Sequence, residues 1–100
     1  LSLHDALPIS AMGALAALDS KDARKGVLVY GIDGAPEGKK LIKEGMMTGT
    51  AAQSPKQMAD TAINAAYQIF DGKKVPKKKV ISVYMITKKN IEQTDISRWQ

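Results

Sequence analysis

Apolar and polar positions occur in blocks along the chain, and the first blocks predict a helix followed by a strand. From Ala11, the stretch AMGALAALDS places Met12, Leu15 and Leu18 on one helical face. After the polar loop KDARKG, the run VLVYGID over 27–33 is too continuously apolar to have one wet face. Such a run is typical of a buried strand in a parallel sheet.

The next two blocks repeat this order. GAPEGKKLIKEG predicts a short helix, because Pro36 suits a first helical turn and Gly45 suits a helix end. MMTGTAAQ over 46–53 predicts a second strand, although Gly49 weakens it. The chain therefore alternates helix and strand up to Gln53.

The longest predicted helix follows at SPKQMADTAINAAYQIFDGK. Ser54 is suited to the N-cap, Pro55 to the first helical position and Gly72 to the stop. Its apolar residues form one stripe. The members of the stripe are Met58, Ala62, Ala65, Ala66 and Ile69.

The remaining chain adds a charged link, KKVPKKK, a third strand, VISVYMIT over 80–87, and a polar tail. The order is α-β-α-β-α-β, which predicts an α/β fold with largely parallel strands, a partial parallel-sheet α/β sandwich. Three strands and part of a helix offer little cover for two sheet faces. We therefore expect the chain to be the C-terminal piece of something longer.

Composition narrows the function classes. The chain has 100 residues, a formal net charge of +5 and no cysteine, which excludes thiolate metal sites. Its lysines fall in runs at 39–40, 73–74 and 77–79, and we interpret these as solvated surface. No aromatic interleaving or recognition motif accompanies them, so no nucleic-acid partner is expected. No apolar run approaches the length of a membrane span.

Two polar residues stand at predicted strand ends, Asp33 after the first strand and Gln53 after the second. Ligands of open α/β sheets bind beyond these carboxyl ends. A carboxylate accepts hydrogen bonds while an amide both donates and accepts, so the pair suits a neutral polyhydroxyl ligand. The alternative is structural: Asp33 caps the turn into the next helix and Gln53 bonds the backbone at its strand end.

Other chemistry has little support in the sequence. His4 is the sole histidine, and no nucleophile–base pair or paired carboxylates are visible. The glycines of GIDGAPEG fit neither the dinucleotide fingerprint nor a P-loop. We expect no enzyme activity, no metal and no cofactor, although an α/β sheet can host many chemistries.

Three stretches carry a family resemblance: AMGALAAL, VLVYGIDGAPEGKKLIKEGMMTGTAAQSP and MADTAINAAYQIFDGKKVP. In order and spacing they resemble the C-terminal third of the sugar-binding proteins of bacterial ABC transporters, of the ribose-binding type. The resemblance implies two α/β lobes joined by three hinge crossings and closing on a sugar. The family's G-[FI]-D-G aspartate and A-Q-x-P glutamine hydrogen-bond sugar hydroxyls, and they match Asp33 and Gln53.

The resemblance also implies a division of the chain. Residues 11–53 would belong to the C-terminal lobe, with the hinge at Gln53 and Ser54. Residues 54–80 would belong to the N-terminal lobe, and residues 81–100 would form a crossing strand and tail. Because most of the N-terminal lobe is absent, the apolar stripe of the long helix would be exposed.

The implied function is solute capture for an ABC importer. The partners would be a monosaccharide or related polyol and a membrane permease, in the periplasm or on a membrane-anchored lipoprotein outside the cell. The alternative is the effector-binding core of a sugar-responsive LacI-type transcriptional regulator, which shares the fold. The link DGKKVPKKK and the tail DISRWQ resemble the transport group more closely.

The opening LSLHDALPI fits neither group. Its codons can be written as the end of a widely used sequencing adapter, so we interpret residues 1–10 as non-native and expect the biology to start at Ser10 or Ala11. The family's upstream sugar-contacting asparagine would fall near Leu7, where no asparagine stands.

Overall fold

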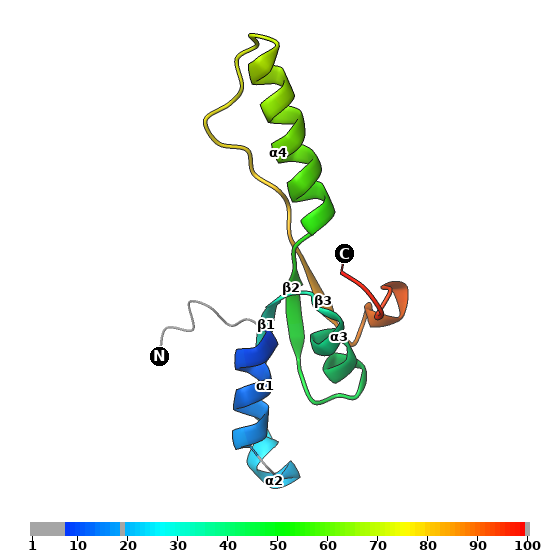
Figure 1. The fold of residues 1–100 in the computed structure, drawn as a ribbon. Coiled ribbons are helices and arrows are strands. Elements are labelled where there is room, and N and C mark those ends of the chain that lie inside the picture. Colours follow the sequence, from blue (N-terminus) through cyan, green and yellow to red (C-terminus); the bar gives the residue numbers. More distant parts are fainter. Residues whose placement is uncertain (1–7, 19, 100) are drawn as a thin grey trace.

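The computed structural model describes residues 8–18 and 20–99, which contain the predicted helices and strands in the predicted order, together with one further short helix and a 3₁₀ turn (Figure 1). The elements are α1 (Pro8–Ala17), α2 (Lys21–Arg24), β1 (Tyr30–Asp33), α3 (Pro36–Lys43), β2 (Gly49–Ala52), α4 (Pro55–Phe70), β3 (Tyr84–Thr87) and the 3₁₀ turn η1 (Ile91–Gln93). None of the helices in these two ranges is long and apolar enough to cross a membrane.

The N-terminal helices differ from expectation at two places. Helix α1 begins at Pro8 rather than near Ala11. Helix α2 lies in the predicted loop, where the Ser20 hydroxyl oxygen accepts the Ala23 N–H at 3.0 Å and caps its first turn. Residues 1–7 of the adapter-like stretch lie outside the described residues.

Each strand is shorter than its apolar run. The two ladders pair only four residues per strand, over 30–33, 49–52 and 84–87. Val27 and Leu28, at the start of the first run, are 46% and 71% exposed. Hydrophobicity alone does not extend a strand, because the backbone also needs a neighbouring strand with which to pair.

The sheet has the order β1-β2-β3. β1 and β2 are parallel, as predicted, whereas β3 runs antiparallel to β2. Figure 1 shows the reason. The chain leaves the sheet at the carboxyl end of β2, passes through α4 and returns to the sheet at that same end. Because β3 begins beside the end of β2, it must run in the opposite direction to β2.

The core lies on one face of this sheet, under α1 and α3, which contact the sheet and each other. Its buried members are Ala11, Leu15, Ile42, Met47, Ala52, Ile86 and Ile91. The other face is open, and Tyr30 and Met85 are each 46% exposed. One face of the sheet is therefore packed while the other lacks cover.

Helix α4 stands away from the sheet and gives the molecule an elongated form (Figure 1). The radius of gyration is 17.0 Å, against about 13 Å for a compact chain of this length. No residue of α4 is buried, and Met58 and Ile69 of its apolar stripe are 45% and 57% exposed. This agrees with the exposure that the family resemblance implies.

One lysine corrects the interpretation of the lysine runs as solvated surface. The Lys39 side chain is fully buried, and its ammonium donates to the carbonyl oxygens of Asp95 at 2.9 Å and Arg98 at 2.7 Å. Burial lowers the pKa of Lys39, the carboxylate of Asp95 partly offsets this, and Arg98 lowers it further. The lysine fastens the C-terminal tail to α3, while its neighbour Lys40 is exposed.

Candidate ligand-binding site

Asp33 and Gln53 meet at the carboxyl edge of the parallel strands. Asp33 ends β1, and Gln53 follows the last residue of β2. The Gln53 amide nitrogen Nε2 donates to the Asp33 carboxylate oxygen Oδ1 at 3.2 Å, and both residues are half-buried. The predicted placement of the two residues is confirmed, and their contact with a ligand stays a prediction.

The backbone at Asp33 is unusual. Its φ of +90° makes it the single non-glycine with positive φ among residues 8–18 and 20–99. An L-residue reaches this region at a cost of about 1–2 kcal/mol, which aspartate tolerates better than most. Strained residues of this kind persist only where their surroundings hold them, and they gather at functional sites.

The following residue explains how the turn is held. Gly34 also has positive φ, +66°, and a Cβ placed there would lie 2.7 Å from the Cβ of Ala52. Its N–H donates to the Thr50 hydroxyl oxygen at 3.2 Å. Only glycine allows the turn after β1 to lie this close to β2, and this approach brings Asp33 to Gln53.

The predicted hinge residue Ser54 begins α4 as expected. Its hydroxyl oxygen accepts the Gln57 N–H at 3.3 Å, and Pro55 occupies the first turn. The chain turns out of the sheet at this point (Figure 1). The N-cap is confirmed, and the hinge at Gln53 and Ser54 stays a prediction.

Tyr84 lies at the same edge, although the sequence patterns did not single it out. The antiparallel register pairs it with Ala52, next to Gln53, and burial raises the pKa of its hydroxyl. The sequence patterns missed Tyr84 because they did not predict that β3 runs antiparallel to β2. The prediction of largely parallel strands gave no reason to expect Tyr84 opposite Ala52, whereas the antiparallel register places it there.

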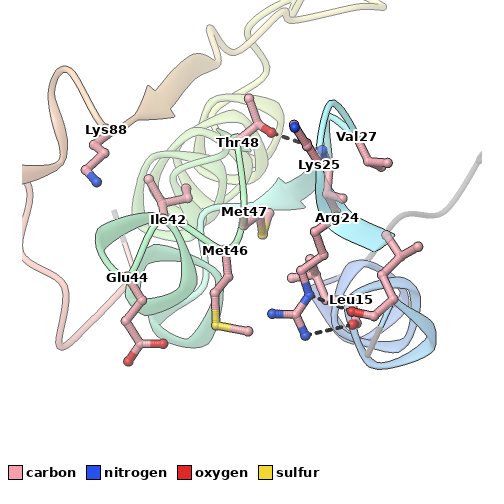
Figure 2. A pocket seen from close by; sticks show the side chains of 13 residues that line it. Leu15, Arg24, Lys25, Val27, Ile42, Glu44, Met46, Met47, Thr48 and Lys88 are labelled. Atoms are coloured by element: carbon pink, nitrogen blue, oxygen red, sulfur yellow. Dashed lines mark hydrogen bonds between the residues drawn. The ribbon is translucent and has the colours of Figure 1, made fainter. Parts of the chain in front are cut away.

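A hollow of about 640 Å³ lies at the opposite end of the sheet, between α1, α2 and the loop after α3 (Figure 2). Its Arg24 guanidinium donates to the carbonyl oxygens of Leu18 at 2.6 Å and Leu15 at 3.3 Å, and so caps the end of α1. The hollow therefore lies at one end of the sheet, while the polar pair Asp33 and Gln53 lies at the other. We place the candidate site at Asp33 and Gln53, where polar groups converge, because Arg24 has a structural role.

The fold and the polar strand ends define an α/β protein of the periplasmic-binding type. Residues 8–74 match the family described as the periplasmic binding protein domain, and the chain belongs to this family. No group of three metal-ligating side chains gathers within the part of the chain that the structure describes.

Among individual proteins, the chain is 35% identical over 78 residues to the ribose import binding protein RbsB of Salmonella typhimurium, covering 78% of this chain and 26% of that protein. It is 40% identical over 53 residues to the D-allose-binding periplasmic protein of Escherichia coli, covering 53% and 17%. The chain spans about a quarter of the length of the ribose-binding relative.

Solved structures show the same likeness. An ABC transporter solute-binding protein of Actinobacillus succinogenes with bound D-allose has a TM-score of 0.76 and 27% identity, over 84% of this chain and 30% of that one. A Bacillus halodurans solute-binding protein with bound myo-inositol has a TM-score of 0.72 and 31% identity, over 83% and 29%. These matches confirm the predicted fold class.

Proposed function

We propose that this chain is part of the sugar-binding component of an ABC import system. The observation that carries the proposal is the contact between Gln53 and Asp33 at the carboxyl edge of β1 and β2. The proteins named above support it, because they are a ribose import binding protein, a D-allose-binding protein and a solute-binding protein with bound myo-inositol. These similarities favour transport over the LacI-type alternative.

The chemistry of the pair suits neighbouring hydroxyl groups. The Asp33 carboxylate can accept hydrogen bonds from two hydroxyls, while the Gln53 amide donates one to a hydroxyl oxygen and accepts one from another hydroxyl. A hydrogen bond to a charged group contributes about 1.5–3 kcal/mol when it is desolvated. The ligand is held and released without a bond being made or broken, so the protein is a carrier rather than an enzyme.

A cleft needs a second wall, and the path of the chain indicates where that wall attaches. Residues 11–53 contribute to one lobe, the hinge lies at Gln53 and Ser54, and residues 54–80 contribute to the other lobe. Residues 81–100 cross back and form the tail. The uncovered α4 supports this division, because its apolar stripe then packs within the second lobe.

Lobe closure at this hinge would enclose the sugar, and the closed form would deliver it to a membrane permease. The site of action would be the periplasm or the outer side of the membrane, with a lipoprotein anchor in the second case. The periplasmic D-allose relative supports this location.

Titration calorimetry on the complete protein tests the proposal. D-ribose, D-allose and myo-inositol serve as probes, and we expect at least one to bind. Asp33→Asn weakens that binding by about ten- to a hundredfold, because the charged acceptor is lost. Asp60→Asn is the matched control, since Asp60 is exposed on α4 and pairs with Lys56. Absence of binding to all three sugars, or equal affinity of Asp33→Asn and the wild type, contradicts the proposal.

A further inference from the structure

We propose that Thr50 is a positioning residue of this site, which sets the geometry of Asp33 against Gln53 without touching the ligand. The Thr50 side chain is 1% exposed and lies one strand away from Asp33. This inference rests on the proposed function, because it concerns how the sugar-binding pair is held.

The strained backbone of Asp33 needs a restraint. At φ +90° the residue is outside the broad regions that a free chain prefers, so the turn after β1 relaxes unless it is restrained. Two contacts restrain it: the Gly34 N–H donates to the Thr50 hydroxyl, and Gly34 packs on Ala52. The first contact is directional, and it is buried away from competing water.

Strand β2 contributes both the residue that restrains the turn and the segment that leads into Gln53. Thr50 and Ala52 lie on one face of β2, and Gln53 follows directly. Strand β2 therefore holds the turn that aims Asp33 and also presents the amide that Asp33 meets. A site fixed in this way is preorganised, so the ligand does not bear the cost of ordering it.

Thr50→Val tests the role, because valine keeps the shape and removes the acceptor. The chain offers a matched control in Thr48, whose hydroxyl oxygen accepts the Val29 N–H at 3.0 Å near the other end of the same strand pair. Both substitutions remove one side-chain acceptor from one backbone N–H. We expect Thr50→Val to bind sugar about tenfold more weakly, and Thr48→Val to bind within about twofold of wild type.

The measurement is calorimetric affinity in the complete protein, for whichever of D-ribose, D-allose and myo-inositol the wild type binds. Melting temperatures fall for both valine variants, so a shared loss of stability does not explain a difference in affinity. Thr50→Ser restores wild-type affinity because it keeps the hydroxyl. If the wild type binds and Thr50→Val binds as tightly as Thr48→Val, the positioning role is wrong while the proposed function stands. If the wild type binds none of the three sugars, the proposed function itself fails.

A second measurement needs no variant. Hydrogen exchange at the Gly34 amide in the wild-type protein without sugar reports whether the turn is held in advance. We expect this amide to exchange at least about tenfold more slowly than the amide of the exposed Gly26, which shares a positive φ. Equal exchange rates at the two glycines overturn the inference.

Discussion

At the scale of single residues, adjacent side chains of the same type can have different structural roles. Lys39 and Lys40 are adjacent, yet the first is fully buried on two tail carbonyls and the second is exposed. Desolvating an ammonium is costly unless its protons find acceptors, and the carbonyls of Asp95 and Arg98 supply them. Lys39 therefore fastens the end of the tail, beyond the core contact that Ile91 makes.

Lys39→Met tests this attachment. The variant leaves two carbonyl oxygens without their donor, and we expect a loss of about 1–3 kcal/mol in the free energy of unfolding. Urea titration followed by Trp99 fluorescence measures it, because Trp99 is in the same tail. Lys40→Met serves as the control and should change stability by less than about 0.5 kcal/mol. Equal stabilities of the two variants contradict the attachment.

The lowered pKa of Lys39 predicts a pH dependence. Between the folded pKa and the ordinary value of 10.5, the unfolded chain binds more protons than the folded one. Stability from this group therefore rises as the pH increases through that window. Urea titrations from about pH 8 to 10.5 should show a stabilising increment in the wild type that Lys39→Met lacks. An identical pH profile for both proteins contradicts the prediction.

At the scale of elements, the sequence predicted the order of helices and strands because the apolar spacing and the proline, serine and glycine signals are local. It also placed Asp33 and Gln53, since parallel strands bring their carboxyl ends to one edge. It missed the antiparallel direction of β3, and with it the position of Tyr84, because strand direction depends on the path of the intervening chain. The burial of Lys39 depends on residues more than fifty positions away, and no local pattern reports such a contact.

The N-cap of α4 gives a prediction at this scale. Helix α4 gains little from tertiary packing, so its end signals matter more than in a buried helix. Ser54→Ala removes the oxygen that accepts the Gln57 N–H and should destabilise the helix by about 1 kcal/mol. Circular dichroism at 222 nm during a thermal melt measures the lost helicity. The exposed Ser82, in the link before β3, provides the control as Ser82→Ala. Equal melts of the two variants contradict the capping role.

At the scale of the whole molecule, one packed sheet face and one bare helix coexist in a single chain. Ile63, Tyr67 and Phe70 of α4 are 54%, 67% and 85% exposed. Apolar exposure on this scale favours association in water.

The isolated 100-residue chain should therefore self-associate. Sedimentation velocity should show weight-average mass rising with concentration, and Ile69→Lys combined with Phe70→Lys should reduce this rise. The control is Lys73→Glu combined with Lys74→Glu, which changes charge beyond the end of α4 without changing its apolar area. A monodisperse monomer that melts cooperatively contradicts the prediction.

The buried ammonium also has a consequence for biosynthesis. The two carbonyls that receive Lys39 lie 56 and 59 residues further along the chain. At about 5–20 residues per second, the ribosome adds that length in roughly 3–12 s, and until then the two acceptors of the folded chain do not exist. A product that ends before Asp95 never supplies the acceptors. The ammonium of Lys39 can therefore be buried on these two carbonyls only after the chain has grown past Arg98.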